Sequence, residues 1–470
     1  MQRGISPLSP PPANLKLASS SSPWKVIWKM LGIVILLYLL TQFFVIVVYG
    51  LYENDPFLTA VGGICLLPLL ALHLFVTRPK LTHILVASPN QEGSNQHMIT
   101  KNRMLQTPIP TTFEHHLVRN SEPVEFPKTS TLWFVFGVTV LVSFLGLLPV
   151  FLDNSNPLYV VLALMIGIPA WLFGFSLPVH AWWAFSTRYL EIMTTRYAAE
   201  NMLIAGMLST IPAIIINSLI FPETLNFIGI TDHGPGSIGE LLILAISAPV
   251  GEELCKAGFV LLLYRLIDSP RRGFQIGFSV GLGFAMLENL QYILFSLLNE
   301  EAAISYSLTA IIRGIGSIPG HAFWTSLSGL SIGWWLCRTR GMVINSENRQ
   351  IQQNWMVFDS NSGQLVDVNS SDSAISLKLK RWLYKPVERT WSLPKEPIIG
   401  IMFAISGHSI WNGSSWIISK ITEDMSLISH LIINLVWIGI LISGLWFIAR
   451  QVLASVLHIP HFQIEFNKRT

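Results

Sequence analysis

Long apolar segments separated by polar ones make up most of the chain. About 20 consecutive apolar residues are enough to cross the hydrocarbon core of a bilayer as a helix. Ten segments of this kind lie at approximately residues 30–49, 57–76, 132–152, 158–179, 202–221, 239–263, 274–298, 304–336, 398–418 and 427–449. The pattern predicts an all-α polytopic membrane protein with about ten transmembrane helices.

The composition leads to the same fold class. Hydrophobic residues make up 51% of the chain and charged residues only 12%, whereas soluble domains carry about 25% charged residues. The net charge of +3 gives no reason to expect nucleic acid as a partner, and the composition predicts the lipid bilayer as the environment. Cys65, Cys255 and Cys337 have neither the spacing of a metal site nor that of a disulfide framework.

Lysine and arginine are concentrated in alternate connections between the apolar segments. The N-terminal tail and the connections at 77–130, 180–200, 265–273 and 337–397 are basic, and most connections between them are acidic or neutral. Positively charged connections stay on the cytoplasmic side of a membrane. We therefore expect a multi-pass protein of the plasma (inner) membrane with both termini in the cytoplasm.

The expected domain organisation follows from these segments. It consists of a disordered basic tail (1–29), an N-terminal four-span region (30–200) with a cytoplasmic loop (77–130), a membrane core (201–340), a cytoplasmic insert (341–397), two spans that complete the core (398–450) and a cytoplasmic tail (451–470). Within the insert, two short apolar runs flank Ser-Asn-Ser-Gly, which predicts a β-hairpin at 355–368.

The sixth apolar segment carries three charged side chains near its middle. The sequence from Ser247 to Lys256 is SAPVGEELCK, with Glu252 and Glu253 one turn before Lys256. Three unpaired charges at this depth would cost on the order of 8–10 kcal/mol, at about 2.5–3.5 kcal/mol each. Because Glu252 and Lys256 are spaced i, i+4, they share a helix face and can form an ion pair. Loss of Glu252 is then expected to leave the ammonium unpaired, at a cost of about 3–5 kcal/mol.

The next three apolar segments also hold polar residues near their centres. Glu288 lies in the seventh, His321 in the eighth, and His408 and Asn412 in the ninth. Taken alone, each has a structural explanation, such as a buried ion pair or a hydrogen bond between helices. Their occurrence on four consecutive segments instead indicates a functional site, because ionisable residues inside a membrane are functional by default.

Residues that disturb helices lie beside these polar groups. The pairs are Pro249 before Glu252, Pro319 before His321 and Gly407 before His408. Broken transmembrane helices are tolerated where they line a cavity, so the pairs predict one shared polar chamber near the membrane midplane. In the seventh segment, Gly277, Gly281 and Gly283 form a small-residue surface that allows another helix to approach closely.

Four motifs combine these residues: EELCK (252–256), GFAMLEN (283–289), HAFWT (321–325) and HSIWN (408–412). Their order on consecutive spans resembles the motif series of the PrsW family of intramembrane proteases, which is distantly similar to the CAAX-processing and bacteriocin-processing membrane proteases. The resemblance implies hydrolysis of a peptide bond inside the membrane. It also implies a membrane-anchored protein as substrate, cleaved in a regulatory pathway. The insert between the last two motifs is longer than the family pattern.

The residue types also suit proteolysis on chemical grounds. Hydrolysis of an amide needs an activated water, a stabilised oxyanion and a proton for the leaving amine. Glu252 or Glu253 could accept the proton of the water, and Lys256 could keep one of the two carboxylates ionised. Asn412 could donate a hydrogen bond to the oxyanion.

Two versions of this chemistry remain open. In the first, Glu288, His321 and His408 bind a divalent metal such as zinc, since two histidines and one glutamate with an open fourth position form a known type of catalytic zinc site. In the second, no metal takes part, a glutamate activates the water, and His408 and Asn412 bind the oxyanion. No compact His-Glu-x-x-His motif is present to decide between the two.

Other functions are compatible with parts of the pattern. Buried acids, histidines and broken helices also build the ion paths of ion- or proton-coupled transporters. An inverted repeat would favour a transporter, and none is visible in the sequence. A CAAX-type processing protease and a non-catalytic membrane scaffold are further alternatives, but the scaffold leaves the four motifs unexplained.

Overall fold

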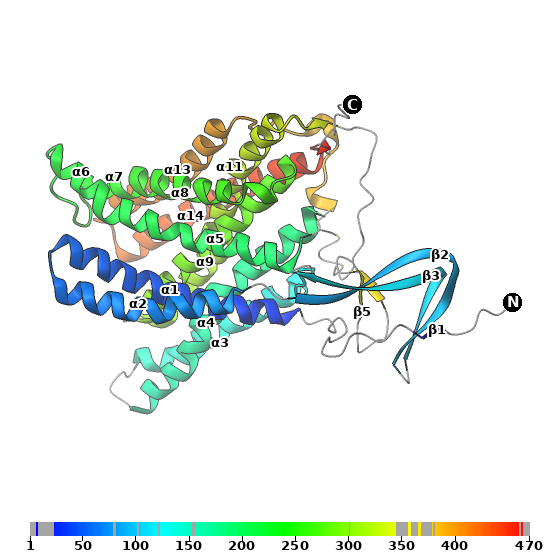
Figure 1. Cartoon of the computed structure of the whole chain (residues 1–470). Coiled ribbons are helices and arrows are strands. Elements are labelled where there is room, and N and C mark those ends of the chain that lie inside the picture. The colour runs from blue at the N-terminus through cyan, green and yellow to red at the C-terminus, as the bar shows by residue number, and fades with distance from the viewer. Residues whose placement is uncertain are drawn as a thin grey trace.

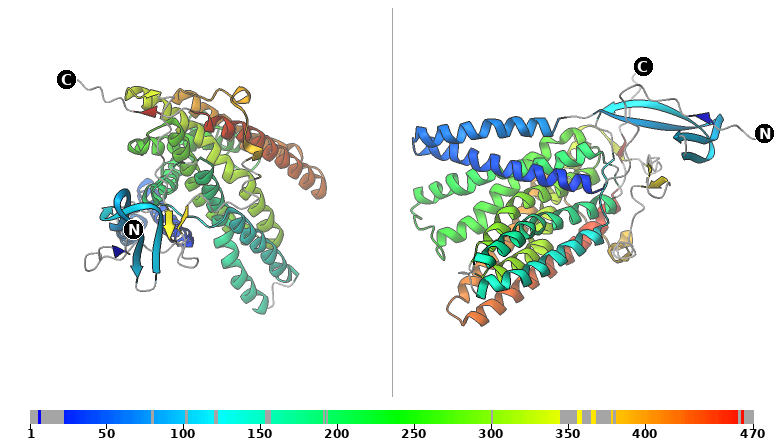
Figure 2. Two further views of the ribbon diagram at one scale, coloured as in Figure 1. Left: turned by 90° about the vertical axis from the view of Figure 1, so that its right-hand side faces the viewer. Right: turned by 90° about the horizontal axis from the view of Figure 1, so that it is seen from below.

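The helices run side by side in one bundle, and most of the strands lie at one end of it (Figure 1). The computed structural model describes residues 6–7, 23–459 and 462–463, apart from 79–80, 101–102, 120–122, 153–156, 191, 193, 300, 345–355, 359–364, 368–377 and 379–380. The predicted disorder of the tail at 1–29 falls mainly outside these residues. Figure 2 shows the same bundle from the end that carries the strands and from below.

Most of the described chain forms long helical segments, three of which contain a wider π-helical turn (η1, η2 and η4). The segments are α1 (Trp24–Tyr52), α2 (Pro56–Val76), α3 (Thr129–Leu152), α4 (Pro157–Leu190), α5–η1–α6 (Arg196–Ile215, Ile216–Ile220, Phe221–Phe227), α7–η2–α8 (Ile238–Leu242, Ile243–Ser247, Ala248–Leu262), α9 (Pro270–Leu297), α10–η4–α11 (Ala302–Ile312, Arg313–Ser317, Ile318–Thr339), α13 (Pro397–Ile421) and α14 (Leu427–Leu457). Short 3₁₀ turns are η3 (Tyr264–Leu266) and η5 (Val387–Arg389).

Seven helices among the described residues are long and apolar enough to cross a membrane. The three long segments that fall outside this set are α7–η2–α8, α10–η4–α11 and α13. These are the segments that carry Glu252, His321 and His408. The helical polytopic fold is therefore confirmed, while the count of ten spans stays a prediction.

Pro249 and Pro319 each follow a wider turn of the helix and do not break it. The π-helical turns η2 and η4 lie directly before Ala248-Pro249 and Ile318-Pro319, and the helix continues through both. A proline has no N–H and its ring crowds the carbonyl of the preceding turn, so a wider turn accommodates it without a break. The sequence correctly predicts where the helix geometry changes, but not that the backbone remains continuous.

Helix α9 lies between α5 and α11 and touches both backbones. A Cβ atom added to Gly281 would lie 2.3 Å from the carbonyl oxygen of His321, and one added to Gly277 would lie 2.5 Å from that of Thr325. On the other side, a Cβ atom on Gly283 would lie 2.0 Å from the carbonyl oxygen of Leu203. The small-residue surface predicted from the sequence is confirmed, and it brings α11 against α9 at the level of His321.

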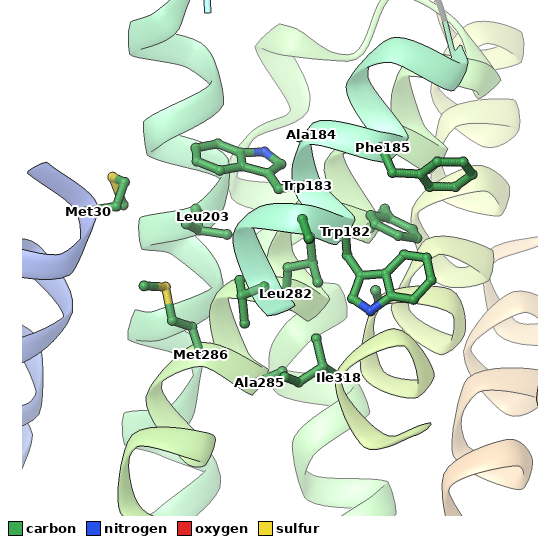
Figure 3. Close-up of a cluster of buried hydrophobic side chains, with 14 of the residues drawn as sticks. Met30, Trp182, Trp183, Ala184, Phe185, Leu203, Leu282, Ala285, Met286 and Ile318 are labelled. Carbon is green, nitrogen blue, oxygen red and sulfur yellow. The ribbon is translucent and has the colours of Figure 1, made fainter. Parts of the chain in front are cut away.

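A hydrophobic core surrounds this packed centre. Figure 3 shows side chains from several helices in it, including Met30 of α1, Trp183 of α4, Leu203 of α5, Leu282 of α9 and Ile318 of α11. Each of these five side chains is at most 1% exposed. The N-terminal helices α1 and α4 are therefore packed onto the helices that carry the motifs.

The strands form two hairpins and one short pair. In the region predicted as a loop, β2 (Leu81–Thr100) and β3 (Arg103–Arg119) form a long antiparallel hairpin, and β1 (Ser6–Pro7) pairs with β2 in parallel. In the insert, β5 (Met356–Phe358) pairs with β6 (Leu365–Asp367), which confirms the hairpin predicted there. The third pair joins β4 (Val343–Ile344) to β7 (Phe462–Gln463) near the C-terminus.

Candidate active site

Three charged residues of α8 form the centre of a buried polar cluster. The Lys256 ammonium donates to Glu253 Oε1 at 2.7 Å and to Glu252 Oε2 at 3.2 Å. Lys256 and Glu253 are 0% exposed and Glu252 is 8% exposed. The ammonium also lies 3.8 Å from the centroid of the Phe284 ring, a contact that attracts a cation to the ring face. The ion pair expected from the i, i+4 spacing is present, and it includes Glu253 as well.

Glu253 accepts hydrogen bonds from three different helices. Besides Lys256, its donors are Thr325 Oγ1 of α11 at 2.9 Å and His408 Nδ1 of α13 at 3.2 Å. A carboxylate can only accept when ionised, so Nδ1 of His408 carries the proton. Nε2 of His408 is then the nitrogen left to face Glu252 Oε2, which lies 3.9 Å away.

His321 lies between a cation and a carboxylate, which fixes its tautomer. Its Nδ1 is 2.9 Å from the Lys256 ammonium and its Nε2 is 3.1 Å from Glu288 Oε2. Because an ammonium can only donate, Nδ1 accepts and Nε2–H donates to Glu288. His321 is therefore neutral in this arrangement, with its Nδ1 lone pair directed to the centre of the cluster.

Aromatic packing holds the second histidine in place. The His408 ring stacks on Trp324, with 4.9 Å between ring centroids and 17° between planes, and its centroid is 4.8 Å from that of His321. A Cβ atom on Gly407 would lie 2.6 Å from Trp324 Nε1. The glycine before His408 therefore leaves room for the indole, and the helix α13 is not broken at this point.

Glu288 lies on the more accessible side of the cluster. Its side chain is 23% exposed, and its Oε2 accepts from the Arg313 guanidinium. Arg313 also donates to Asn289 Oδ1 and lies 3.8 Å from the centroid of the Tyr292 ring. No role for Arg313 is predicted from the sequence, although an arginine inside an apolar span is a sufficient signal that it has a partner.

Asn412 points to the backbone of a neighbouring helix. Its Nδ2 donates to the carbonyl oxygen of Leu244, in the π-helical turn η2, at 3.2 Å. Among the described residues, no hydrogen bond joins this amide to the cluster formed by Glu252, Glu253, Lys256, Glu288, His321 and His408. The oxyanion role assigned to Asn412 therefore stays a prediction.

Three residues of the cluster are candidate ligands of a small divalent cation. One ligand atom each from Glu252, His321 and His408 lies within 4.8 Å of the others, and the side chains would have to draw closer to bind zinc, because ligand atoms around a tetrahedral zinc are about 3.3 Å apart. The other nitrogen of each histidine is bonded to a carboxylate, Glu253 for His408 and Glu288 for His321. Such outer carboxylates orient histidine ligands in metal sites.

These three candidate metal ligands differ in one residue from the three predicted from the sequence. Glu252 takes the place of Glu288, whose carboxylate instead bonds Arg313 and the outer nitrogen of His321. Helical spacing could not distinguish the two, because their distance from the histidines depends on how α8 and α9 pack against α11. Lys256 contacts two of the three residues of the set, so its ammonium already supplies a positive charge there.

Comparison with known proteins finds one family model that matches part of the chain. Residues 195–352 match the family model described as PrsW family intramembrane metalloprotease. The resemblance to that family drawn from the motifs is confirmed over this range, which contains EELCK, GFAMLEN and HAFWT but ends before HSIWN. No curated protein and no solved structure matches the chain.

Proposed function

We propose that the chain is an intramembrane endopeptidase that hydrolyses a peptide bond of a membrane-anchored protein. The family match supports an intramembrane protease at the level of the family. The observation that carries the proposal is the convergence of five side chains of the cluster from the three helices α8, α11 and α13. They are Glu252, Glu253, Lys256, His321 and His408. These side chains provide a base, a fixed cation and two imidazoles around one point.

In the metal-free version of this proposal, the reaction begins with proton transfer from water to Glu252. The oxygen of the water adds to the carbonyl carbon of the peptide bond, the C–N bond then breaks, and the proton held by Glu252 passes to the leaving nitrogen. Glu252 suits this role because it is the less buried of the two glutamates and Lys256 contacts only one of its oxygens at hydrogen-bonding distance. Lys256 can stabilise the negative charge that develops on the carbonyl oxygen.

Glu253 has a different role in this proposal. Its three donors come from α8, α11 and α13, and it is fully buried. We assign it the orientation of His408 and the retention of Lys256, both of which require an ionised carboxylate. Glu288 does the same for His321, with Arg313 as its own partner.

A divalent metal such as zinc would be held by Glu252, His321 and His408, and Glu252 would then be a ligand and no longer the base. When bound, it would supply Lewis-acid activation of the water. In that case Lys256 has to move away from Nδ1 of His321, since the ammonium and a ligated nitrogen cannot share the same lone pair. In the metal-free version, Lys256 remains in place and supplies the positive charge beside Glu252.

If the metal-bound version holds, removing the metal is expected to abolish cleavage. The test uses purified protein in lipid nanodiscs and a pool of synthetic single-span peptides with a fluorophore and a quencher at their ends. We expect about one zinc per chain, at least a tenfold loss of cleavage with 1,10-phenanthroline, and recovery on addition of zinc.

Substitution of single histidines provides the control for the metal experiment. His321→Ala and His408→Ala should each lose zinc, whereas His430→Ala should retain it, because His430 bonds Thr422 at the end of α13, away from the cluster. Full cleavage in the presence of the chelator, with no zinc bound, would establish the metal-free version instead.

The orientation in the membrane is also part of the proposal. In Figure 1 the start of α1, the end of α14 and the β2–β3 hairpin lie at one end of the bundle, while the α1–α2 turn and the α6–α7 connection lie at the other. The turn that contains Glu423 and Asp424 joins α13 to α14 at the same end as α7, since Trp416 of α13 bonds Glu240 of α7. Basic residues predominate at the first end, and we assign that end to the cytoplasm.

Cysteine labelling is expected to report this orientation directly. In a variant whose three native cysteines are replaced by serine, a cysteine at Asp424 should react with a membrane-impermeant maleimide in intact cells. A cysteine at Lys385 should react only after the cells are permeabilised. The reverse pattern would contradict the proposed orientation.

A further inference from the structure

In η2 and η4 the last π-helical hydrogen bond ends at the residue directly before a proline, Pro249 or Pro319. In η2 the N–H of Ala248 bonds the carbonyl of Ile243, five residues earlier. The next bond of this series would run from residue 249 to the carbonyl of Leu244, but Pro249 has no N–H. The carbonyl of Leu244 therefore has no donor in the π register of its own helix.

The same register occurs in η4. The N–H of Ile318 bonds the carbonyl of Arg313. The next bond would run from residue 319 to the carbonyl of Gly314, and Pro319 again provides no N–H. The carbonyls of Leu244 and Gly314 thus each need a hydrogen-bond donor from outside their own helix.

Side chains of other helices supply these donors. Asn412 Nδ2 of α13 donates to the Leu244 carbonyl at 3.2 Å, and Trp182 Nε1 of α4 donates to the Gly314 carbonyl at 2.9 Å. A second indole, Trp446 Nε1 of α14, bonds the neighbouring carbonyl of Ile315 at 3.1 Å. A carbonyl without a partner is costly in a bilayer, so each donor holds its π-helical turn against a particular helix.

These turns lead directly into the residues of the cluster. Leu244 precedes Glu252 by eight residues and Gly314 precedes His321 by seven, about two helical turns in each case. Trp182 is 7% exposed and belongs to the same hydrophobic core cluster as Ile318, the residue before Pro319 (Figure 3). A shift of either turn along its partner helix would therefore move Glu252 relative to His408, or His321 relative to Lys256.

We propose that Asn412 and Trp182 are positioning residues, which set the cluster by donating to the carbonyls that Pro249 and Pro319 leave without a helical donor. This positioning role concerns the proposed peptidase site and rests on the proposed function for what the cluster does. The hydrogen bonds themselves do not depend on that activity. The positioning role assigns Asn412 a backbone partner in place of an oxyanion. It also gives α4, which lies outside the matched residues 195–352, a defined part in the site.

A double-substitution cycle tests Asn412. In Pro249→Ala, residue 249 regains an N–H that can bond the Leu244 carbonyl, so the amide of Asn412 should no longer be needed. Asn412→Ala alone should lower the midpoint of thermal unfolding by about 2 °C and shift the ring N–H signal of His408 in protein labelled with ¹⁵N-histidine. In the Pro249→Ala background, Asn412→Ala should change neither quantity.

The corresponding cycle tests Trp182. Trp182→Phe keeps the aromatic packing of α4 but removes the indole N–H. It should shift the ring signals of His321 in the native background and leave them unchanged in the Pro319→Ala background. The signals are assigned by their loss in His321→Gln and His408→Gln.

Two substitutions provide matched controls. Asn434 donates its amide to the carbonyl of His430 within α14, and Trp437 Nε1 donates to Ser414 Oγ. Neither bond involves a carbonyl next to Pro249 or Pro319. Asn434→Ala and Trp437→Phe should therefore have the same effect with and without the proline substitutions, and neither should shift the His321 and His408 signals.

The possible outcomes separate this inference from the proposed function. If Asn412→Ala has the same effect in both backgrounds, Asn412 acts directly at the site and the positioning role is wrong. If it has no effect in the native background, the hydrogen bond positions nothing and the proposal is equally wrong. Neither readout requires a substrate or a metal, so an inactive protein would count against the peptidase and leave this test intact.

Discussion

Glu252→Gln is expected to reduce cleavage by about 10² to 10⁴-fold, the contribution of a positioned general base, while the protein still folds. Glutamine keeps the size of the side chain but cannot take up a proton from water. The fold should tolerate the change, because Lys256 retains Glu253 at 2.7 Å and Nδ1 of His321 at 2.9 Å. The structure thus removes the sequence-based expectation that loss of Glu252 leaves the ammonium unpaired.

The measurement compares cleavage rates and thermal midpoints of the purified variants. Glu396→Gln is the matched control, because Glu396 pairs with Arg338 in an exposed position and should affect neither quantity. Glu253→Gln should lose stability as well as activity, since glutamine cannot accept from all three donors of Glu253, and one buried donor left unpaired costs about 1–3 kcal/mol. Full turnover by Glu252→Gln would contradict the proposed mechanism.

Lys256→Met is expected to lower the amount of folded protein more than any other single change in the cluster. The Lys256 ammonium donates hydrogen bonds to Glu252, Glu253 and His321, and it is fully buried. Its removal leaves Glu253 as a buried carboxylate without its cation, and breaking a buried ion pair in this way costs about 3–5 kcal/mol. Accumulation in the membrane and the thermal midpoint both measure this effect.

The double variant separates the charge from the packing. Lys256→Met with Glu253→Gln removes both members of the pair, and replacement of a whole buried pair is often neutral or stabilising. It should accumulate better than Lys256→Met alone and still fail to cleave peptides. Lys420→Met is the matched control, because Lys420 pairs with Glu423 in an exposed position. If Lys256→Met accumulates normally, the ammonium is not the cation that the buried carboxylates require.

The sequence by itself determined the helical membrane fold and the residues of the cluster. The length of the apolar segments fixes the helices, because a bilayer requires every backbone group to be bonded within its own segment or a closed barrel. Charged residues in such segments are rare and need partners, which identified Glu252, Glu253, Lys256, His321 and His408 without any structure. The glycines of α9 likewise predicted a close helix contact, which proved to be with α5 on one face and α11 on the other.

The β2–β3 hairpin shows a limit of this approach. The region at 77–130 was predicted as a polar loop, yet it contains β2, a strand of 20 residues that pairs with β3 along most of its length. Pairing of strands depends on contacts between residues distant in the chain, and the hydrophobic alternation there is weak. The shorter β5–β6 hairpin was predicted correctly because two apolar runs flank a clear turn sequence.

Only the tertiary structure decided which atoms face each other within the cluster. Helical spacing places side chains on a face, but the distance between two helices, and their rotation, depends on how all their neighbours pack. That packing brings Glu252 to the histidines and turns Glu288 to Arg313. It also directs the amide of Asn412 to Leu244 and the indole of Trp182 to Gly314, because the prolines free carbonyls that a membrane helix cannot leave without a donor.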